Sequence, residues 1–173
     1  NVFTLGADRS GSLLERAAWH SDDHAPAVKQ ADELAAILYT SGTTGRSKGA
    51  MLSHANLRAM AQGYLTDVDA VTSADCLLHA APMSHGSGLY LVPYLLAGCA
   101  QVIPESGGFD AAEVFALAAS HRGVGMFAAP TIVKRLVEHA AAHAPPLAGL
   151  RTIVYGGGPM YVADLLRALD VVG

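Results

Sequence analysis

The chain has 173 residues, of which 51% are hydrophobic and 15% are charged, so its composition excludes a disordered tail and predicts a folded domain with a hydrophobic core. The formal net charge of −4 argues against a nucleic acid or an acidic membrane bound by bulk charge. The two cysteines fit neither a C-x-x-C pair nor zinc spacing, which favours a reduced, cytoplasmic protein. The most apolar run, residues 88–100, is too short to span a bilayer.

Residues 1–30 are mixed in character and are predicted to form a connector before one α/β domain over residues 31–173. Within that domain, short apolar runs alternate with segments of helical spacing. The apolar runs predict buried strands at 34–39, 76–82, 100–104, 124–130 and 150–155. The segments between them predict helices at 54–68, 86–98, 111–121, 130–143 and 162–169. This alternation is typical of a mainly parallel sheet with helices on both faces.

Several residues indicate where the predicted helices begin and end. Ser53 and Asp110 are suited to N-caps, because their side-chain oxygens can accept a hydrogen bond from a backbone N–H of the first turn. Pro130 suits the start of a helix, and Gly123 suits the end of the helix at 111–121. Pro93 predicts a kink or an early-turn position in the helix at 86–98.

Three loops with unusual composition follow predicted strands, and we name them by chain order. The first loop covers residues 40–49, the second loop residues 82–88 and the third loop residues 156–160. Ligands of parallel sheets bind beyond the carboxyl ends of the strands, so these loops are candidate binding segments.

The first loop combines glycines, hydroxyl side chains and a lysine. Glycine lets successive backbone N–H groups surround an anion, the hydroxyls add donors, and the lysine adds positive charge. The residues concerned are Thr40, Ser41, Gly42, Thr43, Thr44, Gly45, Ser47 and Lys48. They predict a cradle for a polyphosphate, with a flexible polar turn as the alternative. The order Ser47-Lys48-Gly49 differs from the common P-loop, G-x-x-x-x-G-K-[ST].

The stretch "YTSGTTGRSKGAMLSH" (39–54) resembles the phosphate-binding signature of the adenylate-forming superfamily, although Ser47 stands where proline is usual. That superfamily includes acyl- and aryl-CoA synthetases, adenylation domains of nonribosomal peptide synthetases and firefly luciferase. "APMSHGSG" (81–88) resembles its segment at the acyl pocket, and "IVYGGGPM" (153–160) resembles its glycine-rich strand end. The resemblance covers residues 30–173 and implies a partial N-terminal α/β domain of this superfamily.

The resemblance also implies a reaction. Members join a carboxylic acid to ATP with release of pyrophosphate, and a thiol, often that of coenzyme A, then takes the acyl group. Because an anion attacks an anion, preorganised donors and cations are the main catalytic resource. The resemblance implies ATP-binding roles for Thr40, Ser41, Gly42, Thr43, Thr44, Gly45 and Lys48, and for Gly156, Gly157, Gly158 and Pro159. It implies catalytic roles for His85, Lys48 and Thr44, and acid-binding roles for Met83, His85, Gly86 and Tyr155.

The second loop bears on the class of acid. Amino-acid-activating members place an Asp near this motif, because a buried ammonium group needs a charged partner. Residues 78–90 contain no Asp or Glu. We therefore expect a fatty or aryl acid, with coenzyme A as acceptor.

Four alternatives remain open at this point. The first is an amino-acid-activating adenylation domain, and the second is a nucleotide- or phosphate-binding module without synthetase chemistry. The third is an α/β hydrolase suggested by "SHGSG", although the G-x-S-x-G elbow is not met because residue 85 is His. The fourth is a structural α/β domain, which leaves the first loop unexplained.

The family's Tyr-Gly-x-Thr-Glu segment, whose Glu helps to bind Mg²⁺, does not occur in the chain, nor do its ribose-binding Asp and mobile domain with a catalytic lysine. We therefore expect the chain to be part of a longer enzyme and inactive alone, with the Mg²⁺ ligand outside it. No metal site is expected within the chain. His139 and His143 have i, i+4 spacing but no evident third ligand, and we expect them to be solvated. "HSDDH" (20–24) is expected to be a polar connector.

Overall fold

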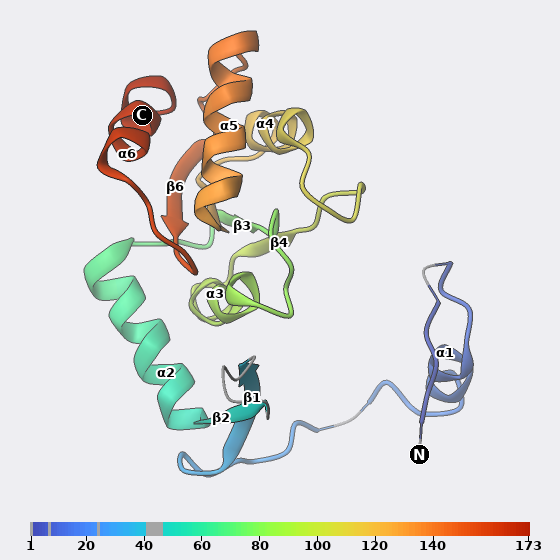
Figure 1. Cartoon of the computed structure of the whole chain (residues 1–173). Coiled ribbons are helices and arrows are strands. Elements are labelled where there is room, and N and C mark those ends of the chain that lie inside the picture. The colour runs from blue at the N-terminus through green and yellow to red at the C-terminus, as the bar shows by residue number, and fades with distance from the viewer. Residues whose placement is uncertain (1, 7, 24, 41–46) are drawn as a thin grey trace. The chain divides into compact units, whose positions relative to one another are not determined.

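The computed structural model describes residues 2–6, 8–23, 25–40 and 47–173, and it divides the chain into two units, Asn1–Gln30 and Ala31–Gly173 (Figure 1). The smaller unit contains the short helix α1 (Ser12–Ala17). Before this helix, Thr4 N donates to Ser12 Oγ at 3.0 Å, and Ser12 N donates to Thr4 Oγ1 at 3.2 Å. These reciprocal bonds join the first residues of the unit to the start of α1. All the predicted site residues belong to the larger unit.

A parallel sheet forms the centre of the larger unit. In the described part of the chain it has the strand order β4-β3-β5-β6. The strands are β3 (Cys76–Leu78), β4 (Ala100–Val102), β5 (Val124–Ala128) and β6 (Leu150–Tyr155). Each lies where an apolar run predicted a strand, and all neighbouring pairs in this sheet are parallel, as predicted. The central strands β3 and β5 are apolar throughout, because helices cover both faces of the sheet.

Helices lie on both faces of the sheet. They are α2 (His54–Gly63) with its π-helical continuation η1 (Tyr64–Val68), α3 (Gly86–Leu96), α4 (Ala111–Ser120), α5 (Pro130–His143) and α6 (Val162–Val171). Successive side chains of a strand point to opposite faces, and β3 shows the result. Leu78 packs with α4 and α5 residues in one cluster, whereas Leu77 packs with Tyr64 of η1 and Tyr94 of α3 in another.

The predicted N-caps are confirmed. Ser53 Oγ accepts a hydrogen bond from Asn56 N at 3.2 Å, and Asn56 Oδ1 accepts one from Ser53 N at 3.0 Å, which makes a reciprocal capping box. Asp110 Oδ1 accepts from Glu113 N at 2.8 Å at the start of α4. Pro130 occupies the first turn of α5, as its fixed φ and missing N–H favour.

Two predicted helix boundaries differ in detail. α4 ends at Ser120 with His121 as its C-cap, and Gly123, with φ +58°, turns the chain into β5 two residues later. α3 continues through Pro93 to Leu96, so the proline lies inside the helix. Pro93 has no backbone N–H, so the helix loses one hydrogen-bond donor at this position. The proline ring is fully buried in the core.

The expectation that the first apolar run joins the parallel sheet is wrong. β1 (Leu34–Thr40) pairs antiparallel with β2 (Lys48–Ser53) in a separate two-stranded sheet, with Ile37 opposite Met51 and Thr40 opposite Lys48. The short connection between these strands suits a hairpin, whereas parallel strands need a crossover of a dozen or more residues. The first loop therefore joins two strands of a hairpin and does not follow a parallel strand.

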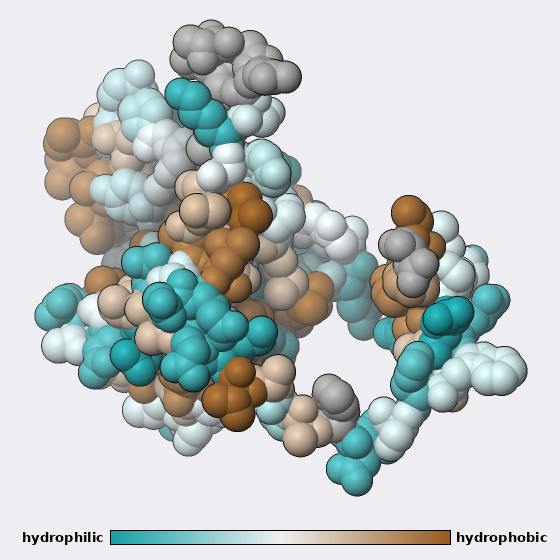
Figure 2. Space-filling model, turned by 90° about the horizontal axis from the view of Figure 1, so that it is seen from below, coloured by the Kyte–Doolittle hydropathy of each residue, from teal (hydrophilic) through white to brown (hydrophobic). Residues whose placement is uncertain are grey.

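On the face seen in Figure 2, apolar residues and polar residues gather in separate patches. Large apolar side chains are exposed on the hairpin, among them those of Tyr39 and Met51, and on α6, among them those of Leu166 and Leu169. No helix in the described ranges is both long enough and apolar enough to cross a membrane.

Candidate functional site

The second and third loops leave the same edge of the parallel sheet. Leu78 is the last residue of β3 and Tyr155 is the last residue of β6, so the segments after both strands lie at the carboxyl edge. β5 lies between these two strands, with Ala128 opposite Tyr155. This edge is where a parallel sheet binds ligands.

The side chain of Phe127 in β5 contacts glycines of both loops. A Cβ placed on Gly86 would lie 2.5 Å from Phe127 Cε1, and one placed on Gly156 would lie 3.4 Å from Phe127 Cε2. The ring also stacks on Tyr90 of α3, with centroids 5.3 Å apart and planes inclined by 17°. The structure thus brings Gly86 and Gly156 together on the two sides of one aromatic ring.

The second loop is a tight turn that presents His85 to solvent. His85 N donates to Pro82 O at 3.1 Å, and Gly88 N donates to His85 O at 3.1 Å. A Cβ on Gly88 would collide with the carbonyl oxygen of Met83, so the turn requires glycine at this position. The exposed imidazole of His85 has its Nδ1 2.9 Å from Ser84 Oγ, and the Met83 side chain is also exposed. Met83 and His85, two of the residues predicted to bind the acid, are therefore accessible.

The third loop carries the predicted residues Gly156, Gly157, Gly158 and Pro159. Gly157 has φ +81°, a left-handed conformation that side chains disfavour, so this position needs glycine for backbone reasons. A Cβ on Gly158 would make ordinary contact with the Pro130 ring at 3.8 Å. The loop therefore lies beside the start of α5.

Tyr155 lies on the opposite face of the sheet from Phe127. Its neighbour Val154 packs with the cluster that contains Leu77, whereas Ile153 packs on the α4 and α5 side. Strand alternation places Tyr155 on the same side as Ile153. The structure therefore does not bring Tyr155 together with Gly86.

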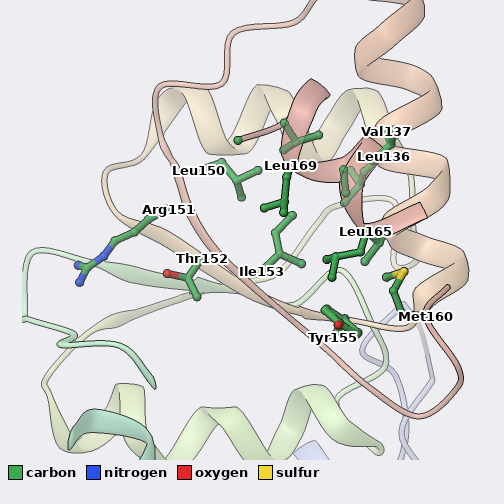
Figure 3. Close-up of a pocket in the computed structure, with 14 residues that line it drawn as sticks. Leu136, Val137, Leu150, Arg151, Thr152, Ile153, Tyr155, Met160, Leu165 and Leu169 are labelled. Atoms are coloured by element: carbon green, nitrogen blue, oxygen red, sulfur yellow. The ribbon is translucent and has the colours of Figure 1, made fainter. Parts of the chain in front are cut away.

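Tyr155 lines an apolar pocket between β6, α5 and α6 (Figure 3). Figure 3 shows Ile153, Leu165 and Leu169 pointing toward one another, with Met160 near Tyr155 and the Arg151 side chain directed away. In the described part of the chain β6 lies at the edge of the parallel sheet, so this pocket lies beside an edge strand.

The first loop is described at its two ends. Thr40 and Lys48 form the last residue pair of the hairpin, and Ser41, Gly42, Thr43, Thr44 and Gly45 lie outside the described residues. The predicted phosphate cradle stays a prediction. β2 leads through the Ser53 cap into α2, and α2 packs against α3, whose first residue is Gly86. The first and second loops thus belong to elements linked through packed helices.

Sequence reasoning missed a buried polar cluster beneath the second loop. His79, directly after β3, is 5% exposed, and its Nδ1 lies 2.8 Å from Ser87 Oγ in the first turn of α3. Its Nε2 lies 2.9 Å from Gln101 Oε1 in β4. A histidine within an otherwise apolar run was a signal for such a cluster, because buried polar groups are paired. Ser87 is fully buried, which argues against the nucleophilic serine of the hydrolase alternative.

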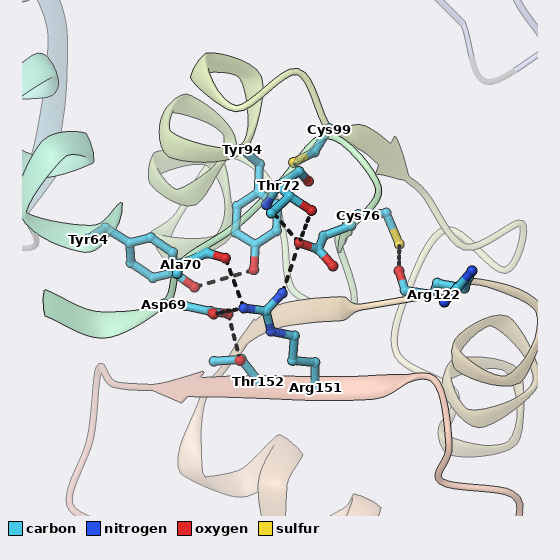
Figure 4. Close-up of polar contacts among 11 residues, drawn as sticks. Tyr64, Asp69, Ala70, Thr72, Cys76, Tyr94, Cys99, Arg122, Arg151 and Thr152 are labelled. Atoms are coloured by element: carbon cyan, nitrogen blue, oxygen red, sulfur yellow. Dashed lines mark hydrogen bonds and ion pairs between the residues drawn. The ribbon is translucent and has the colours of Figure 1, made fainter. Parts of the chain in front are cut away.

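A second polar cluster lies at the amino edge of the sheet, away from the predicted loops (Figure 4). Arg151 near the start of β6 donates to Asp69 Oδ1 at 2.5 Å and to Asp75 Oδ2 at 2.8 Å. Thr152 Oγ1 also donates to Asp69, at 2.7 Å. Burial favours a higher pKa for Asp75, but hydrogen bonds from Thr72 and Arg151 outweigh it, and the pKa of this carboxyl is lowered. The cluster joins the segment before β3 to β6.

The two histidines of α5 differ in environment. His143 is exposed, as expected, whereas His139 is half-buried and stacks on Phe115, with ring centroids 5.8 Å apart. The two imidazoles stack on each other at 4.3 Å, and His143 Nδ1 donates to His139 O at 3.0 Å. Among the described residues, no three His, Cys, Asp or Glu side chains form a group that could hold a metal ion.

The comparisons with known proteins all point to one enzyme family. The family described as AMP-binding enzyme matches residues 3–173. A feruloyl-CoA synthase from Amycolatopsis sp is 33% identical in a match 173 positions long, and the match covers 96% of this chain and 35% of that protein. The human mitochondrial malonate–CoA ligase ACSF3 is 36% identical over 112 residues, which cover 63% of this chain and 19% of that protein. The match includes most of residues 1–30, which the sequence resemblance had left out.

The solved structures that resemble this chain include enzymes that form CoA thioesters, as the relatives do by name. ATP-bound MatB from Rhodopseudomonas palustris superposes with a TM-score of 0.80 and 34% identity, over 98% of this chain and 33% of that chain. The O-succinylbenzoate coenzyme A synthetase MenE from Bacillus subtilis, in complex with ATP and magnesium ion, gives a TM-score of 0.71 and 27% identity, over 82% and 29% of the two chains. The chain thus spans about a third of the length of the feruloyl-CoA synthase and of MatB.

Proposed function

Because the chain belongs to the AMP-binding enzyme family, we propose that the full-length protein activates a carboxylic acid with ATP and transfers the acyl group to coenzyme A. In the first step a carboxylate oxygen attacks the α-phosphorus, the bond from that phosphorus to the bridging oxygen breaks, and pyrophosphate leaves. In the second step the thiol sulfur attacks the acyl carbonyl and AMP leaves. The names of the matched relatives, which are CoA ligases and CoA synthases, support this reaction class.

The observation that carries the proposal is the convergence of the second and third loops on Phe127. Gly86 and Gly156 approach one ring at the carboxyl edge of the sheet, and His85 is exposed beside them. We assign His85 to orient the acid carboxylate, and residues 156–159 to form the shelf for adenine and substrate. Glycines suit such a shelf because the backbone can approach a flat ring closely.

The first loop is assigned to the β- and γ-phosphates and the leaving pyrophosphate. Its glycines and hydroxyls supply donors, and Lys48 supplies positive charge where negative charge develops. Thr43 and Thr44 are the hydroxyls we assign to the phosphates. Mg²⁺ would neutralise phosphate charge when bound. We propose that its protein ligand lies outside this chain, because the family's Tyr-Gly-x-Thr-Glu segment, whose Glu helps to bind Mg²⁺, does not occur in this sequence.

The acid is proposed to carry a fatty or aryl tail. Residues 78–90 contain no carboxylate to pair an ammonium group. The exposed Met83 side chain of the second loop supports an apolar contact with the tail. An amino acid would leave its ammonium group without a charged partner at this loop, at a considerable desolvation cost.

The test is acid-dependent ATP–pyrophosphate exchange by the full-length protein. A panel of fatty, aryl, dicarboxylic and amino acids is assayed, and we expect a fatty or aryl acid to stimulate exchange most. Lys48→Ala and His85→Ala are expected to lower that exchange, with Ser120→Ala, at the end of α4, as a folding-matched control. If only an amino acid stimulates exchange, the assignment of a fatty or aryl acid is wrong. If no acid stimulates exchange, the proposed function is wrong.

A further inference from the structure

The cluster of His79, Ser87 and Gln101 lies directly beneath the second loop. The three residues come from the end of β3, the first turn of α3 and the strand β4, so their contacts join three elements. The His79 and Ser87 side chains are 5% and 0% exposed. Ser87 is sealed from solvent, and His79 reaches only the wall of a pocket that Met83 also lines, so we expect both side chains to act in the reaction through the loop that they hold.

The cluster forms a satisfied hydrogen-bond chain. Gln101 Nε2 donates to Cys99 O at 3.4 Å, which turns Gln101 Oε1 toward His79. With that orientation, His79 Nε2–H donates to Gln101 Oε1 and Nδ1 accepts the hydroxyl proton of Ser87. Both nitrogens of a neutral imidazole are then used. Removal of either partner leaves a buried polar atom unpaired, which is costly.

The bond from Ser87 to His79 closes a short stretch of chain. That stretch contains Met83, His85 and Gly86, which are the second-loop residues predicted to bind the acid. Gly86 also rests against Phe127 on the neighbouring strand β5. The loop is therefore held at two places, by a hydrogen bond at its base and by the aromatic ring beside Gly86.

We propose that His79 and Ser87 are positioning residues that fix the second loop, and with it the exposed imidazole of His85, for the acid. This inference rests on the proposed function for its consequence in catalysis. The hydroxyl and imidazole resemble a nucleophile and its base in distance, but Ser87 is sealed in the core and works as an anchor. A loop released from that anchor moves His85 relative to the bound acid, and a misplacement of about 1 Å is enough to lower a rate about a hundredfold.

Kinetics of the full-length protein test the positioning role. Ser87→Ala and His79→Leu are expected to lower kcat/KM for the acid by about ten- to a hundredfold with little change in KM for ATP. His79→Asn places an amide near the Nδ1 position and is expected to recover part of the loss. The matched control is Ser120→Ala, which removes another Ser–His contact, Ser120 Oγ to His121 Nδ1 at 3.0 Å. It lies at the end of α4 and is expected to leave both constants unchanged.

Amide hydrogen exchange separates this proposal from the proposed function. The amides of His85 and Gly88, which donate within the loop, are expected to lose protection in Ser87→Ala and not in Ser120→Ala, with each variant measured equally far below its own melting temperature. Unaltered protection, or equal loss of acid and ATP parameters, would overturn the positioning role. If the wild-type protein shows no acid-dependent activity, the proposed function fails, and the amide measurement still decides whether the anchor exists.

Discussion

Replacement of Arg151 by alanine is expected to destabilise the larger unit through the two carboxylates that it leaves behind. Arg151 pairs with Asp69 and Asp75, whose side chains are 7% and 11% exposed. Thr152 would still donate to Asp69, and the backbone and hydroxyl of Thr72 would still donate to Asp75. Each carboxylate thus loses its charged partner and keeps some of its hydrogen bonds.

The magnitude follows from burial. Removal of one partner of a buried ion pair costs about 3–5 kcal/mol. The Arg151 side chain is 36% exposed, so water screens part of its charge, and we expect the free energy of unfolding to fall by about 2–3 kcal/mol. The control is Lys134→Ala, which breaks the pair between α5 and α6 at 2.9 Å with Asp164. The Lys134 and Asp164 side chains are 47% and 29% exposed, so we expect the free energy of unfolding to fall by less than about 1 kcal/mol.

Urea unfolding of the 173-residue chain, followed by far-ultraviolet circular dichroism, measures this difference. The tryptophan of the chain lies in the smaller unit, so its fluorescence is unsuited to the purpose. The variants are compared at equal slope of free energy against urea concentration, which shows that the unfolded states expose the same surface. Equal midpoints for Arg151→Ala and Lys134→Ala would refute the reasoning that the buried carboxylates depend on this guanidinium.

Three further predictions concern pH, backbone packing and thiols. The pKa of Asp75 is lowered in the folded state, so the stability that its carboxylate contributes is present above the unfolded pKa of about 3.8 and declines as pH falls below that value. In an acid titration, the free energy of unfolding of Arg151→Ala should therefore decline less than that of the wild-type protein. Gly88→Ala forces a Cβ against the Met83 carbonyl and should lower the free energy of unfolding by about 1–3 kcal/mol. Gly63→Ala has open space around it in α2 and should raise the free energy of unfolding by about 0.5–1 kcal/mol, and thermal melts measure both changes. Both buried cysteines, whose pKa values burial raises, should react with a thiol reagent far more slowly in native buffer than in denaturant; equal rates would contradict their burial.

The strands and helices of the parallel sheet could be predicted because burial on both faces leaves a strong pattern. The runs at 76–82 and 124–130 read as strands since both faces of β3 and β5 lie in the core. The caps at Ser53 and Asp110 could be predicted because the signal is local, an oxygen placed before a helical segment. Local signals and two-sided burial therefore account for most of the fold.

The hairpin partner β2 could not be predicted in the same way. Lys48–Ser53 has most of its side chains exposed, so it lacks both a buried run and a clear alternation. Its pairing with β1 decides the strand direction, and pairing is a property of the folded chain. The prediction of a parallel strand at 34–39 failed for that reason.

The contacts that organise the candidate site also lie beyond sequence reasoning. Phe127 lies between Gly86 and Gly156, and His79 bonds to Ser87, because β3, β5 and β6 are neighbours in the sheet. The motifs indicated which loops carry chemistry, but strand order decides which of them meet. The pairing of Arg151 with two distant aspartates depends on that order as well.

ATP–pyrophosphate exchange by the full-length protein, measured with and without a carboxylic acid, tests the central claim most directly. The account predicts exchange that depends on a fatty or aryl acid and that Lys48→Ala and His85→Ala reduce while Ser120→Ala does not. Exchange that no acid stimulates in a folded, nucleotide-binding protein would contradict the account and favour a phosphate-binding module instead.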